Sequence, residues 1–219
     1  MKIRMEFSRF REKLTETAQT ADFDYEFIDN DSEELSRLEG YLFPDTYEFY
    51  ENENTVSVIN KMLNNFEKRY TTAMRNLTEK NGKTIAEIVV LASLIEKEAM
   101  WESERTMISG VIYNRLNSPD RFPKLQIDAT LMYVTGHKEA LTADDLLIDS
   151  PYNTYLYDGL PPTAICNPGL NAILAAISPE PNEYYYYVAD PETGGHVFSK
   201  TLDEHNAAVA AMRTKYNKN

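Results

Sequence analysis

The alternation of hydrophobic and polar positions predicts a chain built largely from amphipathic helices. Apolar residues recur every three or four positions over residues 7–17 and over residues 55–80; Asn54 precedes the second run and Gly82 follows it. This spacing places the apolar side chains on one face of a helix, and Asn before or Gly after such a run is a common helix boundary. The first 80 residues are therefore predicted to contain one short and one long amphipathic helix.

Residues 84–101 predict a helix of a different kind. Between positions 88 and 95 the segment is apolar almost all round, as expected for a helix in the middle of a fold rather than at its surface. A further helix is predicted over residues 102–116. Shorter helical segments are predicted over residues 128–135 and 142–147.

The last part of the chain predicts a helix, a β-hairpin and a final helix. Asn167–Pro168 has the residue types of a helix cap and first turn, and the helix it starts should end at Ser178. Residues 184–189 and 196–199 are β-rich runs joined by a Gly-containing turn, which predicts a hairpin. A capping-box sequence then starts a helix over residues 201–216. The fold class is predicted to be helix-rich α+β with a small β-sheet.

Length and charge restrict the domain organisation and the partners. A chain of 219 residues suggests one domain, or one domain with a small annex. An acidic stretch over residues 22–34 makes a boundary near residue 36 plausible, dividing the chain into residues 1–36 and 37–219. The formal net charge is −13, with 22 Lys and Arg against 35 Asp and Glu. This balance repels polyanions, so no nucleic-acid partner is expected.

Cysteine and histidine usage gives no sign of a metal site or of a bound cofactor. Cys166 is the one cysteine, which excludes an intramolecular disulfide and a cysteine zinc cluster, and it is interpreted as an inert thiol. His137, His196 and His205 are scattered and lack metal-binding spacing. No apolar run reaches the ~18 residues of a membrane span, so the chain as given is expected to be soluble.

Carboxylates inside the most apolar helix are the first candidates for chemistry. Glu96 and Glu98 interrupt a segment that otherwise favours burial, and burial raises a carboxyl pKa towards the range of a general acid. The helical face of Glu96 carries mostly small neighbours, which leaves room for a substrate and places Glu96 ahead of Glu98. The alternative is that Lys97 and Arg105 neutralise both acids at a helix surface.

A tyrosine-rich loop is the second candidate. Tyrosine rings beside Asn and Thr side chains are typical of carbohydrate sites, where sugar faces lie on rings and hydroxyls form hydrogen bonds. The alternative is a proline-stiffened loop that packs its tyrosines on the core. Gln126 could add polar contacts, as could Asp128 unless it caps the following helix, and His196 is either a polar site residue or a hydrogen-bonded structural histidine. The loop candidates are Tyr152, Asn153, Thr154 and Tyr155.

Together these segments resemble the catalytic region of the YceG-like endolytic murein transglycosylases. The resemblance covers about residues 38–206, with the motifs in the order of the family. The matching segments are LEGYLFPDTY (38–47), ASLIEKE (92–98), VIYNRL (111–116), LQID (125–128), YNTY (152–155), GLPP (159–162), NPG (167–169), VAD (188–190), GGHVF (194–198) and HN (205–206).

The resemblance implies a fold, a reaction and a place of action. Residues 1–36 would be the remnant of a LysM-like subdomain, and an N-terminal anchor outside this chain would hold the protein at the extracytoplasmic face of the membrane. The substrate would be peptidoglycan strands, with peptidoglycan synthases as implied partners. Glu96 would cleave the MurNAc-β-1,4-GlcNAc bond as acid and then base, leaving a 1,6-anhydro end, while Gln126, Asn153 and Tyr155 orient the sugar and Asp128 supports them.

Two rival functions follow from the same residues. A glycoside hydrolase would use Glu96 as acid and Asp128 or Glu98 as base acting on water, because ordinary glycosidases need two carboxylates. A glycan-binding or scaffold module would bind strands without cleaving them. The end groups of the products distinguish a hydrolase, which leaves reducing ends, from a transglycosylase. A Glu96→Gln variant distinguishes a binding module from an enzyme, because binding should survive and any cleavage should vanish.

Overall fold

The computed structural model of the protein describes residues 2–32, 35–136, 138 and 140–216. Helices dominate this part of the chain and the β-structure is one two-stranded sheet, which confirms the helix-rich α+β class. The α-helices are α1 (Lys2–Thr20), α2 (Thr55–Arg69), α3 (Thr72–Lys80), α4 (Ile85–Glu98), α5 (Arg105–Leu116), α6 (Asp128–Thr135), α7 (Leu170–Ile177) and α8 (Leu202–Tyr216). The 3₁₀ helices are η1 (Leu35–Leu38), η2 (Glu102–Glu104) and η3 (Asp145–Leu147), and the strands are β1 (Tyr186–Ala189) and β2 (His196–Ser199).

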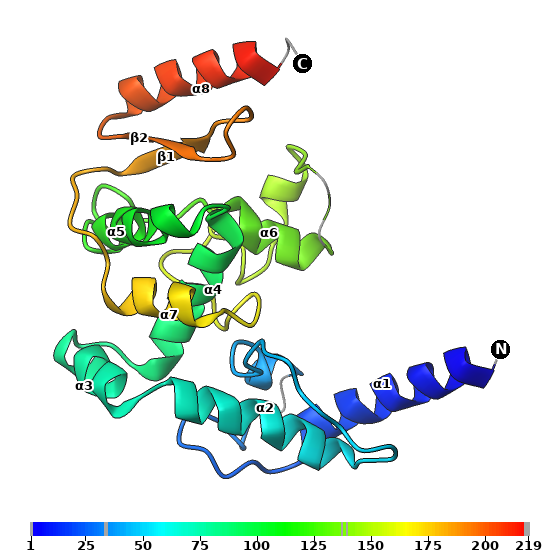
Figure 1. Cartoon of the computed structure of the whole chain (residues 1–219). Coiled ribbons are helices and arrows are strands. Elements are labelled where there is room, and N and C mark those ends of the chain that lie inside the picture. The colour runs from blue at the N-terminus through cyan, green and yellow to red at the C-terminus, as the bar shows by residue number, and fades with distance from the viewer. Residues whose placement is uncertain (1, 33–34, 137, 139, 217–219) are drawn as a thin grey trace.

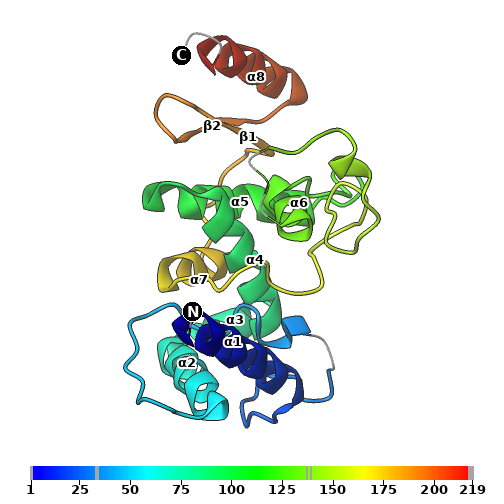
Figure 2. The same cartoon turned by 90° about the vertical axis from the view of Figure 1, so that its right-hand side faces the viewer.

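Helix α4 runs through the middle of the molecule, as its apolar sequence predicts (Figures 1 and 2). Thr84 and Glu87 form a reciprocal capping box at its start, and every residue from Ile88 to Ile95 is buried. Helices α5, α6 and α7 all pack against it. The C-terminal end of α4 points towards the β-hairpin, so the two glutamates lie where the core opens to the surface.

The hairpin and α8 form one end of the molecule, opposite the end that carries α1 and α2 (Figure 1). The strands are antiparallel, with Tyr186 opposite Ser199 and Ala189 opposite His196. The predicted capping box is present: Thr201 Oγ1 accepts from the Glu204 N–H at 3.2 Å, and Glu204 accepts from the Thr201 N–H at 3.2 Å. The predicted hairpin and final helix are confirmed.

The predicted long helix over residues 55–80 is instead two helices. Asn54 caps α2 as expected, accepting from the Ser57 N–H at 2.8 Å, but the helix ends at Arg69. The Thr71 side chain then caps α3. Tyr70 lies at the break, with its ring buried and its hydroxyl 2.5 Å from Thr78 Oγ1. The apolar spacing continues across residues 70 and 71, so periodicity alone does not reveal the break.

The predicted start of the helix after Asn167 is also wrong. Helix α7 begins at Leu170, and Asn167 accepts from the backbone N–H groups of Gly40 and Leu42 at 2.9 and 3.0 Å. Gly40 has a φ of +96°, and a Cβ there would lie 2.3 Å from Cγ1 of Val89. Asn167 therefore supports a tight loop that only glycine can form against α4.

The first segment of the chain shares the core of the rest. Phe23 and Ile28 belong to the same hydrophobic cluster as the residues of α4, and the Phe27 ring lies 5.1 Å from Tyr41 and 4.7 Å from Phe66. The predicted helix over residues 7–17 lies within the longer α1. The division at residue 36 and the LysM-like origin of residues 1–36 stay predictions.

Candidate active site

Glu96 and Glu98 leave the last turn of α4 in nearly opposite directions. Successive residues of an α-helix are rotated by about 100°, so two positions of separation turn the side chain by about 200°. Glu98 faces the hairpin and the start of α6, whereas Glu96 faces the start of α7. The two acids of one triplet therefore belong to two different environments.

Glu98 lies among hydrogen-bond donors in a half-buried position. The Tyr187 hydroxyl donates to Glu98 Oε2 at 3.0 Å, and the Ala129 N–H is a second donor. Burial raises the pKa of Glu98 and the negative charge of Asp128 raises it further, while the two donors and the nearby His196 act in the opposite direction. The net shift is upward, as expected for a carboxyl group that carries a proton at a higher pH than usual.

Asp128 and Tyr155 form the neighbouring pair. Asp128 is exposed and is the first residue of α6, whose N-cap is Ile127. The alternative that Asp128 caps this helix is therefore wrong. Its Oδ1 accepts from the Tyr155 hydroxyl. Burial and this hydrogen bond raise the pKa of Tyr155, so the phenol stays a donor. Asp128, Tyr155, Glu98 and Tyr187 thus form one polar cluster between α4, α6 and the hairpin.

His196 holds the hairpin beside this cluster. Its Nδ1 lies 2.9 Å from Glu104 Oε2, its backbone N–H donates to Glu104 Oε1 at 2.9 Å, and its ring meets the Tyr187 ring edge-on at 5.3 Å. Only 6% of its side chain is exposed. Between the two interpretations of His196 left open by the sequence, the contacts favour the structural histidine.

Glu96 is held by an ion pair and a backbone contact. Arg105 donates to its Oε1 at 3.0 Å, and the Gly169 N–H donates to its Oε2 at 3.2 Å. The side chain is 29% exposed. The space that small neighbours were expected to leave beside Glu96 is therefore taken by a guanidinium, and the structure separates Glu96 from the other predicted site residues.

The loop candidates divide into one residue at the cluster and three that build the loop. Asn153 is completely buried and donates to the carbonyls of Leu146 and Ile148 at 3.1 and 2.8 Å. Thr154, also buried, accepts from the Ile127 N–H at 2.9 Å. Tyr152 bonds Thr163 and packs on Tyr133. Of these four residues, Tyr155 alone contacts a candidate carboxylate in the described structure.

Gln126 connects the cluster to α5. It is exposed, has a φ of +55°, and accepts from Arg115 at 2.7 Å through its side-chain oxygen. Arg115 and Glu104 were missed by sequence reasoning. Tyr187 was recognised only as part of the β-rich run over residues 184–189. Alternate residues of a strand face opposite sides, but this does not say which tyrosines face α4.

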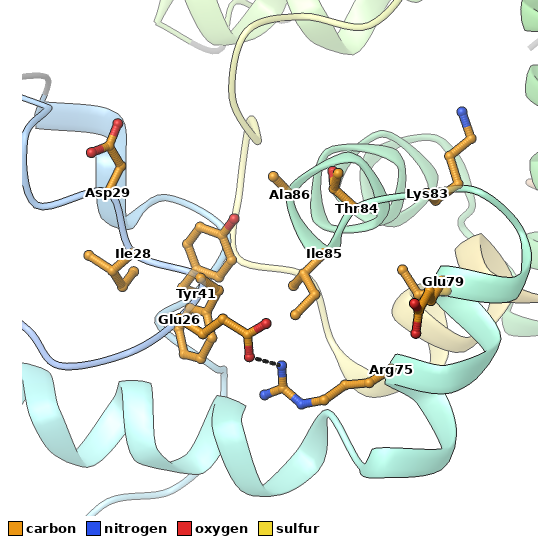
Figure 3. Close-up of a pocket in the computed structure, with 12 residues that line it drawn as sticks. Glu26, Ile28, Asp29, Tyr41, Arg75, Glu79, Lys83, Thr84, Ile85 and Ala86 are labelled. Carbon is orange, nitrogen blue, oxygen red and sulfur yellow. Dashed lines mark hydrogen bonds and ion pairs between the residues drawn. The ribbon is translucent and has the colours of Figure 1, made fainter.

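Two cavities lie at different ends of α4. One of about 360 Å³ is lined by Tyr155 and Tyr187, next to the polar cluster. The other, of about 600 Å³, lies between residues 26–29 and the α3–α4 junction, where Arg75 pairs with Glu26 (Figure 3). None of the candidate carboxylates lines the larger cavity, so size alone does not locate the site.

Neither a metal centre nor a membrane-spanning helix was found in the described part of the chain. No group of three or more His, Cys, Asp or Glu side chains there could hold a metal ion, and His137 lies outside the described residues. No described helix is both long and apolar enough to cross a bilayer.

The Cys166 thiol donates to the Ser93 carbonyl at 3.5 Å, and burial raises its pKa to about 12, in keeping with an inert thiol.

The fold and the cluster define a helix-rich α+β domain with a half-buried carboxyl group suited to acid–base chemistry. The chain belongs to the YceG-like family, whose model matches residues 3–211.

Relatives of known name agree with this assignment. The chain is 41% identical over 172 residues to an endolytic murein transglycosylase of Bacillus subtilis strain 168, covering 78% of this chain and 47% of that protein. It is 37% identical over 186 residues to an endolytic murein transglycosylase of Streptococcus pneumoniae serotype 2 strain D39, covering 82% and 33%. The chain thus spans about half or one third of the length of these relatives.

A solved structure supports the same fold. The crystal structure of a protein described as yceG-like from Listeria monocytogenes superposes with a TM-score of 0.74 at 34% identity, covering 94% of this chain and 63% of that one. The arrangement of the helices and the hairpin is therefore shared with an experimentally determined structure.

Proposed function

We propose that this chain is the catalytic region of an endolytic peptidoglycan lytic transglycosylase. It would cleave the MurNAc-β-1,4-GlcNAc bond within glycan strands and leave 1,6-anhydro-MurNAc ends. Family membership and the names of the two relatives support the reaction class. The polar cluster on α4 supports it independently, because it offers a carboxyl group suited to proton transfer beside a cavity.

We assign the acid–base role to Glu98 rather than to Glu96, which the sequence placed first. The observation that carries this choice is the raised pKa of Glu98, caused by burial and by Asp128. A general acid must hold its proton near the working pH, and burial favours the protonated form of a carboxyl group. Glu96 is instead tied to Arg105 by an ion pair, so its Oε1 is occupied by a protein donor.

One carboxyl group is sufficient for the proposed reaction. Protonated Glu98 donates to the glycosidic oxygen while the bond from that oxygen to C1 of the muramyl sugar breaks. The resulting carboxylate takes the proton of the muramyl 6-hydroxyl, whose oxygen attacks C1 and closes the anhydro ring. The proton returns to Glu98 and no water is consumed. The nucleophile belongs to the substrate and is already in place, so no second catalytic carboxylate is needed.

The other predicted residues take supporting roles in this proposal. Asp128, Tyr155 and Gln126 are partly or fully exposed around Glu98 and would orient the sugar. The buried Asn153 and Thr154, with Tyr152, would hold the loop that positions Tyr155. His196 would hold the hairpin that brings the Tyr187 hydroxyl to Glu98.

The setting of the enzyme is part of the same proposal. Peptidoglycan lies outside the cytoplasm, so the protein would act at the extracytoplasmic face of the membrane, held by an anchor outside this chain. Peptidoglycan synthases are proposed partners because these enzymes make the strands that would be cut. Both statements rest on the family and its substrate rather than on a surface of this structure.

The decisive experiment is mass analysis of uncrosslinked glycan strands incubated with the parent protein, Glu98→Gln and Glu96→Gln. We expect anhydro-ended fragments, lighter by one water than reducing ends, from the parent and from Glu96→Gln but not from Glu98→Gln. Loss of cleavage in Glu96→Gln alone would return the role to Glu96. Reducing ends would indicate a hydrolase in which Asp128 activates water, and intact strands with retained binding would indicate a binding module.

A further inference from the structure

The cavity of about 360 Å³ adjoins the proposed catalytic centre without containing its carboxylates. It is enclosed by α5, residues 125–127, the first strand of the hairpin and the start of α8. Tyr155 and Tyr187 form the shared wall: both line the cavity, and their hydroxyl groups bond Asp128 and Glu98. A substrate bound at Glu98 could therefore extend past the two tyrosines into this cavity.

Arg115 brings a positive charge to the cavity that no carboxylate of the described protein neutralises. Its terminal nitrogens donate to neutral oxygens: the carbonyls of Tyr185 and Lys124, at 3.3 and 3.0 Å, and the side chain of Gln126. Its Nε is buried and has no partner among the described residues. Burial lowers the pKa of Arg115, as expected for a guanidinium charge that the protein only partly compensates.

A second residue of the cavity wall carries an unpartnered nitrogen. Nδ1 of His205 is buried without a hydrogen-bond partner in the described structure, and its ring stacks on Tyr186 at 5.2 Å. Burial lowers the pKa of His205 and the charge of Arg115 lowers it further, so the imidazole is kept neutral and one tautomer offers an N–H at Nδ1. Two groups able to donate thus lack an acceptor in one cavity, although buried polar groups are normally satisfied.

We propose that this cavity binds a carboxylate of the peptidoglycan substrate, with Arg115 and His205 as its donors. A neutral carbonyl could satisfy one N–H but would leave the guanidinium charge uncompensated, whereas a carboxylate satisfies both. Peptidoglycan carries such groups on the peptide attached to the lactyl ether of its muramyl sugar, or on the lactyl group itself once the peptide is removed. The inference rests on the proposed function, because it is that function which brings muramyl sugars to Glu98.

Binding to cleavage-inactive Glu98→Gln protein tests the proposal without depending on turnover. The probes are soluble strand fragments of three kinds: peptide-bearing with free carboxylates, the same fragments with carboxylates converted to methylamides, and peptide-stripped fragments that retain the lactyl carboxylate. We expect free carboxylates to bind about tenfold or more tightly than the amidated form, the range of one charge-assisted contact. Stripped strands show whether the lactyl group or the peptide supplies the carboxylate. Equal affinity for free and amidated strands would overturn the proposal.

Variants assign the effect to the cavity. Arg115→Gln in the Glu98→Gln background should abolish the preference for free carboxylates while leaving the affinity for amidated strands unchanged. Since Arg115 also bridges backbone carbonyls, its replacement could unfold the site. His205→Phe is therefore the second variant, because it keeps an aromatic ring against Tyr186 while removing both ring nitrogens, Nδ1 among them, and it should reduce the preference severalfold.

Arg121→Gln is the matched control. Arg121 also lies over the Phe122 ring, 4.9 Å from its centroid, but does not line the cavity. If Arg121→Gln abolishes the preference as fully as Arg115→Gln, the effect is general electrostatic attraction and the site assignment is wrong. If the parent yields no anhydro products while the carboxylate preference depends on Arg115, the transglycosylase proposal fails and the carboxylate site stands.

Discussion

Glu96 and Glu98 are the same residue type, two positions apart on one helix, yet the structure places them in opposite chemical settings. Glu96 meets the Arg105 guanidinium and a backbone N–H at the start of α7. Glu98 meets the Tyr187 hydroxyl and a backbone N–H, and it has no ion pair of its own among the described residues; the nearby Asp128 raises its pKa and the nearby His196 lowers it. A cation partner favours a permanent carboxylate, whereas burial beside another acid favours a proton that can be donated.

The difference arises from what α4 packs against. The side of Glu98 is covered by the hairpin, whose Tyr187 lies 89 residues further along the chain. The side of Glu96 is covered by the start of α5 and the start of α7. Acid–base capacity is therefore a property of the tertiary surroundings, and this can be tested by altering the two sides separately.

The largest expected effect is on turnover. Glu98→Gln should lower the rate of strand cleavage by about a hundredfold or more, the usual contribution of a general acid–base group. Glu96→Gln should stay within about tenfold of the parent, because it removes an ion pair and not the proton donor. Initial rates on uncrosslinked strands measure both. Equal losses of cleavage rate in the two variants would contradict the different roles assigned to Glu98 and Glu96.

A smaller effect is expected on the pH dependence of the rate. Tyr187→Phe removes a donor that stabilises the Glu98 carboxylate, so the pKa of Glu98 should rise. The acid must be protonated to act, so the alkaline limb of the rate profile should move to higher pH. Tyr184→Phe is the control, since the Tyr184 side chain has no described contact with Glu98. An unmoved limb, or one displaced to lower pH, would argue against Glu98 as the acid.

Folding stability should reveal the cost of burying Glu98. Its pKa is higher in the folded protein than in the unfolded chain, where the value is about 4.5. Folding therefore takes up protons. The free energy of unfolding should fall as the pH rises from the pKa of Glu98 in the unfolded chain to its pKa in the folded protein. Glu98→Gln should consequently raise the free energy of unfolding at neutral pH by on the order of 1 kcal/mol, with a smaller gain near pH 4. Denaturant titrations at both pH values test this, and a loss of stability at neutral pH would contradict it.

The smallest expected effect concerns the other side of α4. Arg105→Met breaks the ion pair of Glu96, a partly exposed contact that should cost no more than about 1 kcal/mol of folding free energy. Strand cleavage should remain within a fewfold of the parent, because Arg105 does not contact Glu98. A thermal melt and a cleavage assay on the same preparation decide the matter; a collapse of activity without unfolding would place the chemistry on the side of Glu96.

Periodicity predicted much of the fold, and its failures have physical causes. The buried helix α4, the hairpin and the last helix follow from local patterns that agree with the final packing. The break at Tyr70 and the displaced start of α7 depend on contacts with residues far away in the chain. Tertiary context can override local propensity, and at both places residues far away in the chain or a buried ring accompany the departure from the predicted helix.

The candidate site was predicted less completely than the fold. The tyrosine loop and the Gln126–Asp128 segment were recognised from residue types, but composition does not distinguish a side chain that binds sugar from one that holds a loop, as buried Asn153 shows. Glu96 was ranked ahead of Glu98 because its helical neighbours are small. The sequence offered Arg105 only as a neutraliser of both acids, whereas the structure pairs it with Glu96. Tyr187 arrives from another element, so the argument from one helix could not include it.

The sequence by itself determined the helix-rich class, the position of α4 in the core and the presence of two acids at its end, because these depend on local spacing and on the apolar character of one segment. The tertiary structure decided which acid is buried beside donors and which is neutralised, and it brought Arg115 and His205 to one cavity. The surroundings of Glu98 and the cavity both depend on where the hairpin and α8 lie relative to α4 and α5. Contacts between segments so distant in the chain leave no mark in the local pattern of either segment.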